Sequence, residues 1–307
     1  MEHIYDMIIV GGGPGGYTAA LYGARAGLDT LIVERLAAGG QMAQTSQIDN
    51  YPGFAEGVDG FTLAEQRQKG AERFDAKTVY DEVESLKLEG DVKEVRGSAD
   101  TYLGKTVVIA TGANPRPLGL AGEKELTGRG IHYCAACDGM FYRGKTVMVV
   151  GGGNTAAADA MLLSRVAKKV ILVHRRDTLR APKIYHEPIK NAPNIETMWN
   201  SKVVELEHDD YLTGVKVQNV LTGEITEVPV DGVFVSVGRI PVTELVKDSL
   251  TLDAGGYIVA DESTRTSIPG VFAVGDVRTK ALRQVVTAVS DGAVASFYAE
   301  EFLTERA

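Results

Sequence analysis

The chain has 307 residues, of which 44% are hydrophobic, and a formal net charge of −9. This length accommodates two domains of ordinary size, and the hydrophobic content is enough to give each of them a core. The acidic balance argues against a nucleic-acid partner, because neutralising phosphates requires a basic surface. No stretch approaches the ~20 apolar residues of a membrane-spanning helix, so we expect no membrane partner either.

The first residues, Met1–Asp6, lack the basic and apolar regions of a secretion signal. We therefore expect a cytoplasmic protein. In that compartment a cysteine pair is more often catalytic than structural, because the surroundings keep ordinary thiols reduced.

The chain opens with a strand–loop–helix–strand pattern. Met7–Val10 is an apolar run typical of a buried parallel strand, and the glycine-rich segment Gly11–Gly16 follows it at once. The spacing then predicts a helix over Tyr17–Gly27 and a second strand over Thr30–Glu34. This order is that of a βαβ unit.

The glycines of this first loop match the G-x-G-x-x-G pattern that binds dinucleotides. Gly11, Gly13 and Gly16 allow a tight turn, a close approach of the backbone to a pyrophosphate, and close packing of the helix. Glu34 lies 23 residues after Gly11, where an acid accepts hydrogen bonds from ribose hydroxyls. The alternative is a purely structural turn.

The same pattern returns in the middle of the chain. We expect a strand over Thr146–Val150, a loop over Gly151–Ala156, a helix over Ala157–Val166 and a strand over Lys169–Val173. His174 lies 23 residues after Gly151, the offset found in the first copy. The chain therefore contains two related nucleotide-binding modules.

The second module differs from the first where the ribose would lie. In place of an acid it carries His174, Arg175 and Arg176, with Arg180 close behind. Guanidinium groups bind a phosphate in a bidentate way. The second loop is therefore predicted to take NADPH, and the first an adenine dinucleotide without the 2′-phosphate. A solvated basic turn is the alternative for these arginines.

Both cysteines of the chain fall in one C-x-x-C motif, Cys134 and Cys137, just before the second glycine loop. Such a pair suits redox chemistry, in which one thiolate attacks and its neighbour resolves the mixed disulfide. Asp138 follows at once and could carry a proton, and a simple turn residue is the alternative. Zinc would need further ligands than the nearby His132 supplies, so we expect no metal.

The two modules also end alike, and this predicts the domain organisation. Val107–Pro115 and Val233–Pro241 each read as a strand followed by G-x-x-P. The tail contains a strand over Val271–Val274 and a long helix but no glycine loop of its own, so it completes the first module. The charged stretch Asp81–Arg96 reads as exposed strands.

The predicted fold class is therefore α/β, with two Rossmann-like three-layer domains, the second inserted into the first. The expected domains are a first nucleotide-binding domain made of residues 1–114 and 244–307, to which the family resemblance described below assigns FAD, and an NADPH-binding domain of residues 115–243 that carries the redox disulfide.

Further short motifs accompany the cysteine pair: Gly39–Gln41, Asn50–Gly53, His174–Ala181, and Gly275–Asp276 followed by Arg283–Gln284. Together with Cys134–Gly139 they resemble the low-molecular-weight thioredoxin reductases, and the resemblance runs nearly from end to end. One departure is Asp159, where that family commonly has a glutamate.

The resemblance implies cofactors and roles for individual residues. It implies that Cys137 exchanges electrons with the flavin, that Cys134 attacks the disulfide of thioredoxin, and that Asp138 is the acid/base. The expected FAD contacts are Gly11, Gly13, Pro14, Gly16, Glu34, Gly40, Gln41, Asn50, Thr111, Gly112, Gly275, Asp276, Arg283 and Gln284. The expected NADPH contacts are Gly151, Gly153, Asn154, Thr155, Ala156, His174, Arg175, Arg176 and Arg180.

The resemblance also implies a homodimer that reduces thioredoxin at the expense of NADPH. In that family one domain rotates against the other, which makes Pro115 and Gly238–Pro241 the expected hinges. Two other functions stay open: a flavin-dependent reductase of a different protein disulfide or one supplied by ferredoxin, and a regulatory protein that senses nucleotides. The arginines after His174 speak against ferredoxin, and the cysteine pair against a mere sensor.

Overall fold

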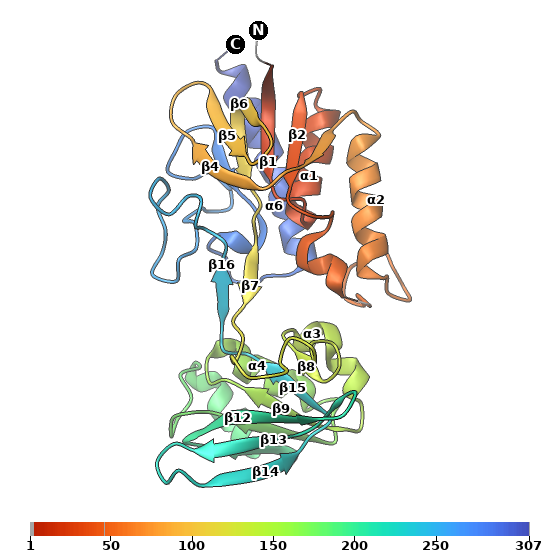
Figure 1. Ribbon diagram of the computed structural model, residues 1–307, viewed down its shortest axis with the longest axis vertical. Helices are drawn as coiled ribbons and strands as arrows, with labels where there is room; N and C mark the ends of the chain where they lie inside the picture. Colours follow the sequence, from red (N-terminus) through yellow and green to blue (C-terminus); the bar gives the residue numbers. More distant parts are fainter. Residues whose placement is uncertain (1–2, 46, 307) are drawn as a thin grey trace. The chain divides into compact units, whose positions relative to one another are not determined.

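The computed structural model describes residues 3–45 and 47–306. The first two residues of the segment tested for a secretion signal lie outside this range. The chain divides into two compact units: unit 1 comprises Met1–Asn114 and Ile240–Ala307, and unit 2 comprises Pro115–Arg239. Unit 1 is thus discontinuous in sequence, as its red-orange and blue segments show (Figure 1).

Unit 1 is built on a seven-stranded sheet in which β1 lies between β2 and β6, parallel to both. Strands β4 and β5 extend the sheet in antiparallel fashion, and β17 pairs with the end of β6. Its strands are β1 (Ile4–Val10), β2 (Thr30–Glu34), β3 (Lys77–Tyr80), β4 (Val83–Lys87), β5 (Lys93–Gly97), β6 (Thr101–Ile109) and β17 (Val271–Ala273). Its helices are α1 (Pro14–Arg25), α2 (Gly60–Glu72) and α6 (Val285–Thr304), with short 3₁₀ turns at Gly40–Gln44 and Gly275–Val277.

Alternation along β1 explains why this sheet is covered on both faces. Met7 and Ile9 pack into one core with Ala295 and Ala299 of α6. Ile8 and Val10, on the opposite face of the sheet, pack into a second core with residues of β5 and of the segment 246–260. The segment Met7–Val10, which is apolar at every position, therefore lies between two layers, as in a parallel sheet buried on both faces.

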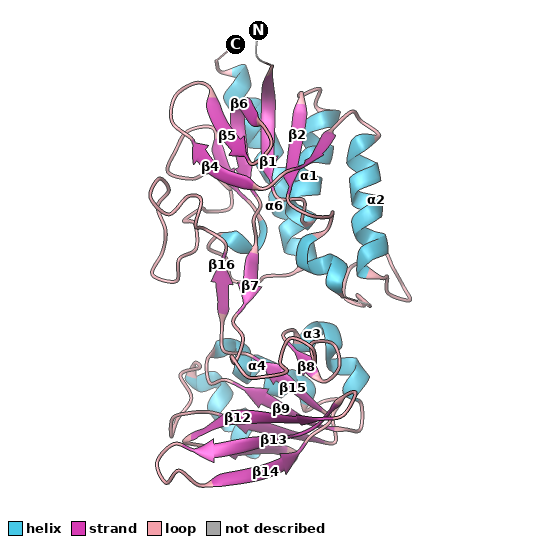
Figure 2. Ribbon diagram, viewed as in Figure 1, coloured by secondary structure: helices cyan, strands magenta, loops and turns pink. Residues whose placement is uncertain are grey.

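Unit 2 repeats this plan. Its five-stranded parallel sheet has the order β11-β10-β9-β15-β8, and a three-stranded antiparallel sheet, β12-β13-β14, forms an additional layer (Figure 2). The strands are β8 (Ile131–His132), β9 (Thr146–Val150), β10 (Lys169–Val173), β11 (Ile195–Met198), β12 (Ser201–His208), β13 (Leu212–Asn219), β14 (Ile225–Pro229) and β15 (Gly232–Val235). The helices are α3 (Ala135–Asp138), α4 (Asn154–Leu163) and α5 (His186–Asn191), with 3₁₀ turns at Gly139–Tyr142 and Lys183–Tyr185.

The alternation seen in β1 returns in β9. Val147 and Val149 pack against α4, whereas Met148 and Val150 pack against the layer formed by β12 and β13. The predicted α/β class with two Rossmann-like domains is confirmed.

The two loop helices begin earlier than predicted. Pro14 and Asn154 are the first residues of α1 and α4, so the last three residues of each glycine-rich segment already belong to the helix. The predicted start at Tyr17 was wrong because proline at the first helical position is preorganised for helix. The predicted start at Ala157 was wrong because Ala156 is already part of α4 and is buried in its core.

The prediction that Asp81–Arg96 forms exposed strands was half right. The stretch contains β4 and part of β5, but β5 is largely buried, and the side chains of Asp81 and Lys93 are buried with it. Lys93 donates to the Gly90 carbonyl at 2.9 Å and lies over the Phe302 ring. The long aliphatic part of the Lys93 side chain is buried, while its amine retains a hydrogen-bond partner. The alternation of charged and apolar residues in the sequence does not indicate this burial.

The segments that cross between the units pair with each other. They form β7 (Ala113–Pro115) and β16 (Arg239–Pro241), a two-stranded sheet. The boundary after Arg239 precedes the expected one after Thr243, because Val242 is held in unit 1: its N–H donates to Gly112, and its carbonyl accepts from Thr111. No helix within the described part of the chain is both long and apolar enough to cross a membrane.

Asp81 offers a test of the packing in unit 1. Its carboxylate accepts hydrogen bonds from the Ser98 hydroxyl, the backbone N–H groups of Ala99 and Asp100, and the Tyr102 hydroxyl. These donors, Ser98 first, lower the pKa of Asp81 to about 2. The ionised Asp81 carboxylate therefore stabilises the folded state fully above pH ~4, the ordinary pKa of aspartate. This stabilisation is lost as the pH falls toward 2.

We expect Asp81→Asn to lower the free energy of unfolding by about 1–3 kcal/mol at neutral pH, because buried donors lose a charged acceptor. The difference from wild type should shrink as the pH falls from about 4 to about 2. Urea denaturation at several pH values measures it, with the exposed Asp210→Asn as control. A penalty that persists undiminished at the lowest pH would contradict the assignment.

Candidate active site

The cysteine pair lies at the start of α3 in unit 2. Cys134 and Cys137 form a disulfide with a Cα–Cα distance of 5.3 Å. Cys134 is the N-cap of the helix, and its carbonyl accepts hydrogen bonds from the N–H groups of Cys137 and Asp138. Both cysteines are half-buried, so the bond is held by the helical turn yet remains reachable. The predicted pairing is confirmed.

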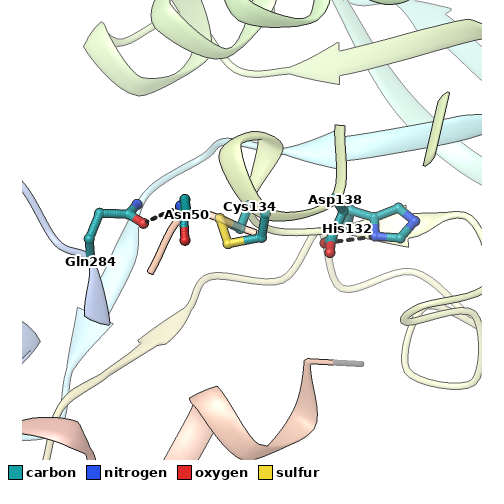
Figure 3. Close-up of a disulfide and its surroundings, with 6 residues drawn as sticks. Asn50, His132, Cys134, Asp138 and Gln284 are labelled. Atoms are coloured by element: carbon teal, nitrogen blue, oxygen red, sulfur yellow. Dashed lines mark hydrogen bonds and ion pairs between the residues drawn. A yellow bond between two sulfur atoms is a disulfide. The ribbon is translucent and has the colours of Figure 1, made fainter. Parts of the chain in front are cut away.

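Asp138 is the last residue of α3, and its carboxylate is bonded to a histidine. Its Oδ2 lies 2.9 Å from Nδ1 of His132 (Figure 3). Nε2 of that ring lies 2.7 Å from the Tyr142 hydroxyl. The His132 side chain is 8% exposed and that of Asp138 is 21% exposed. Asp138 is thus a helical residue with a specific partner rather than a simple turn residue.

His132 is the one residue near the cysteines that was considered as a zinc ligand. The described residues contain no group of three or more His, Cys, Asp or Glu side chains able to hold a metal ion. The sequence placed this histidine near the cysteines but gave no sign of its bond to Asp138. His132 lies in β8, the strand that leads directly into the cysteine turn, and this two-residue strand could not be recognised from the sequence.

The first glycine loop in unit 1 forms a cradle at the start of α1. Gly11 has a φ of +105°, and a Cβ at Gly16 would lie 2.0 Å from the Gly11 carbonyl, so neither position accepts a side chain. A Cβ at Gly13, in contrast, would meet nothing within 4 Å. Gly13 caps α1 without a side-chain acceptor, so no side chain accepts from the N–H groups of the first turn, and such a helix start fits a phosphate.

Glu34 is placed beside this loop. Its Oε2 accepts a hydrogen bond from the Gly12 N–H at 2.6 Å, and its Oε1 accepts one from Leu36 at 3.2 Å. The carboxylate therefore fixes the loop itself, and it lies at the end of β2, where the predicted ribose contact requires it.

Other predicted FAD contacts gather in unit 1. The Gln41 amide donates to the Ala113 carbonyl at 2.6 Å, close to Thr111 and Gly112. The Asn50 amide donates to Gln284, the N-cap of α6, at 3.0 Å (Figure 3). Two segments more than two hundred residues apart in the chain are thereby joined.

The Gly275–Asp276 turn rests on a buried ion cluster that the sequence did not reveal. Asp291 of α6 accepts a hydrogen bond from the Gly275 N–H at 2.8 Å, and it pairs with Arg278 and Lys280 at 2.7 Å each. Arg283 in turn donates to the carbonyl of Asp276. An acid inside an Ala/Val-rich helix was the available signal, because such a position is otherwise apolar.

The second glycine loop repeats the cradle in unit 2. A Cβ at Gly153 would meet nothing within 4 Å, and this residue caps α4 without a side-chain acceptor. Asn154 and Thr155 are exposed at the first turn of α4, whereas Ala156, in the place of the third glycine, is fully buried. The loop again leaves backbone donors open to an anion.

The basic residues after β10 divide into one buried and three exposed. Arg175, Arg176 and Arg180 are exposed, and the Arg180 N–H donates to the Gly152 carbonyl at 2.7 Å. His174 is buried under Gly152, and its Nε2 is a buried atom without a hydrogen-bond partner among the described residues. Burial, and then the nearby arginines, lower the pKa of His174. This ring supports the loop as a neutral group, and the arginines are left to meet a phosphate.

Asp159, which stands where the family commonly has a glutamate, is bonded to the residue that follows β15. The Ser236 hydroxyl donates to its carboxylate at 2.5 Å, and burial raises the pKa of Asp159. The aspartate side chain, which is shorter than that of glutamate, thus has a hydrogen-bond partner within unit 2.

Comparison with known proteins gives one consistent result. Residues 5–292 match the profile of the family described as "Pyridine nucleotide-disulphide oxidoreductase". The chain is 44% identical over 309 residues to a thioredoxin reductase of Peptoclostridium acidaminophilum, covering 99% of this chain and 98% of that protein. It is 45% identical over 305 residues to one of Listeria monocytogenes, covering 99% and 95%. The crystal structure of thioredoxin reductase from Streptococcus pyogenes superposes with a TM-score of 0.90 at 44% identity, covering 99% of this chain and 100% of that one.

Proposed function

The chain belongs to the pyridine nucleotide-disulphide oxidoreductase family, and from this premise we propose that it is an NADPH-dependent flavoprotein that reduces the disulfide of thioredoxin. The observation that carries the proposal is the half-buried Cys134–Cys137 disulfide, with Asp138 beside it, in the same unit as a glycine cradle flanked by exposed arginines. The likeness to thioredoxin reductases over nearly the whole chain supports thioredoxin as the acceptor.

The residues fit both cofactors. The open space at Gly13 and Gly153 and the uncapped first turns of α1 and α4 suit two pyrophosphates. Glu34 suits an unmodified ribose, as in FAD, while Arg175, Arg176 and Arg180 suit the 2′-phosphate of NADPH. Bound there, the two cofactors would supply hydride transfer and pass an electron pair on to the disulfide.

The cysteines carry out the exchange with the acceptor. The Cys134 thiolate attacks one sulfur of the substrate disulfide, which forms a mixed disulfide and releases the other substrate sulfur as a thiolate. Asp138 gives that sulfur a proton. Cys137 then attacks the sulfur of Cys134, re-forms the Cys134–Cys137 bond and releases the second substrate sulfur. Two electrons have then left the pair for the substrate.

The direct test of the proposed function compares NADPH with NADH as the donor for the purified protein, with thioredoxin and a small disulfide as acceptors. We expect rapid oxidation of NADPH that depends on thioredoxin. The homodimer, the cytoplasmic location, the domain assignment and the hinges at Pro115 and Gly238–Pro241 stay predictions.

Replacing the attacking sulfur separates the two halves of the reaction. In Cys134→Ser we expect NADPH to bleach the flavin absorbance about as fast as in wild type, because that step does not need Cys134. Thioredoxin reduction should fall to background, because the nucleophile is gone. Stopped-flow absorbance and a thioredoxin assay measure the two steps, and thioredoxin reduction near the wild-type rate would refute the role of Cys134.

A methyl group added to one glycine loop should impair the binding of one cofactor and leave the other unaffected. Gly13→Ala should fold normally, because its Cβ has room, and yet lose flavin, because the methyl group occupies the space of the pyrophosphate. Gly153→Ala should keep its flavin and show a KM for NADPH raised about 10-fold or more, the effect of about 1.4 kcal/mol of lost binding. If Gly13→Ala retains full flavin content by absorbance, the assignment of the first loop is wrong.

The arginines should set the choice of pyridine nucleotide. Arg175→Ala combined with Arg176→Ala should raise the KM for NADPH by roughly 10- to 100-fold, because charge-assisted hydrogen bonds to the phosphate are lost. The KM for NADH should change little. Steady-state kinetics with both nucleotides provide the readout, and an equal rise for both would show that these residues act on the fold instead.

A further inference from the structure

His132 is a buried titratable group that the reaction described above does not use. One of its ring nitrogens lies 2.9 Å from the Asp138 carboxylate and the other 2.7 Å from the Tyr142 hydroxyl. Both nitrogens are therefore engaged, in a side chain that is 8% exposed. Among residues 3–45 and 47–306, Oδ1 of Asp138 accepts no hydrogen bond, so this bond is the carboxyl group's only side-chain restraint in the described structure.

The ring is fixed more firmly than a loop residue would be. His132 lies in β8, where it pairs in parallel register with Phe234 of β15. Its ring stacks on Phe234 with a centroid distance of 5.3 Å and meets the Tyr142 ring edge-on at 5.1 Å. The strand pairing sets the backbone and the two aromatic rings set the side-chain torsions, so Nδ1 is held pointing at Asp138.

The two hydrogen bonds suit either protonation state of the pair. When Asp138 is ionised, Nδ1–H donates to it and Nε2 accepts from the Tyr142 hydroxyl. When a proton is added, the ring can hold it, because the phenol oxygen can also accept from Nε2–H. Burial, together with Asp138 and Asp231, raises the pKa of Tyr142 to about 12, so the phenol stays neutral in both states.

The surroundings of the ring contain few other charges. From 3₁₀ turn Gly139–Tyr142 it faces the Tyr142 hydroxyl, from β15 the apolar Phe234, and from α3 the Asp138 carboxylate. Asp231, just before β15, and Lys145, which lies over the Tyr142 ring at 5.4 Å, act on the tyrosine. Asp138 is the one acid bonded to the imidazole among the described residues.

We propose that His132 is a positioning residue for Asp138: it holds the carboxyl group toward the cysteine turn and returns a proton to it after each exchange. The proposal rests on the acid/base role of Asp138 in the proposed function. In the step it serves, Asp138 protonates the released substrate thiolate and becomes a carboxylate, and the imidazolium then gives its Nδ1 proton to that carboxylate. The ring is then neutral and keeps its other proton at Nε2, which donates to the Tyr142 oxygen, and it becomes an imidazolium again when Nδ1 takes up a proton from water.

The test compares His132→Phe, which keeps a ring against Phe234 but removes both hydrogen bonds, with His132→Asn, whose amide can still donate to Asp138. His208→Phe, at an exposed histidine of β12, is the matched control. The protein is reduced with NADPH and mixed with thioredoxin or a small disulfide in a stopped-flow instrument across a range of pH. Flavin reduction by NADPH is recorded separately as the step that does not involve His132.

We expect His132→Phe to slow disulfide exchange by roughly 10-fold or more, a share of the ~10²–10⁴ that acid–base groups supply. Its pH profile should change shape, because no imidazole remains to exchange a proton with Asp138. His132→Asn should recover most of the rate at its optimum but keep an altered profile, since the amide positions the carboxyl group without exchanging a proton. Flavin reduction should be unchanged in all variants.

Two results would overturn the proposal: His132→Phe with the rate and the pH profile of wild type, or a slower His132→Phe whose profile is unaltered and which asparagine does not rescue. The second would show that the histidine only packs. Failure of wild type to reduce either acceptor, with flavin reduction intact, would instead refute the proposed function, so the two failures are distinguishable.

Discussion

The proximity of two sulfur atoms is the constraint on which the rest of the molecule depends. Because Cys134 and Cys137 are separated by a single helical turn, their thiols remain neighbours when the disulfide opens. Resolution of a mixed disulfide is then an intramolecular step, favoured over attack by any free thiol. The turn itself is anchored by β8 on one side and by α4 on the other, so the pair is presented by a rigid scaffold.

The two units repeat one architecture with different residues beside the glycine loop. In each, a strand that is buried on both faces runs into a glycine loop, and the residue 23 positions after the first glycine touches that loop. In unit 1 this residue is Glu34, which accepts a hydrogen bond from Gly12. In unit 2 it is His174, which supports Gly152 from below and leaves the following arginines exposed. A different residue at the equivalent position therefore changes both the support of the loop and the charge beside it.

Much of this was predictable because local sequence carries it. Continuous apolar runs, glycine spacing and the duplicated strand–loop–helix pattern were enough for the fold class, which depends on elements close together in the chain. The ion cluster around Asp291, the burial of Lys93 and the bond between His132 and Asp138 were not predictable. Each joins a polar side chain to a partner chosen by tertiary packing, and residue type alone does not say which polar groups will be buried together.

The central claim is that the disulfide and the flavin form one electron store. Anaerobic titration of the purified protein with NADPH, followed by absorbance, tests this most directly. The claim predicts that each chain takes up about four electrons, two for the flavin and two for the disulfide, from two equivalents of NADPH. Saturation after one equivalent, with the Cys134–Cys137 bond still intact by thiol counting, would contradict it.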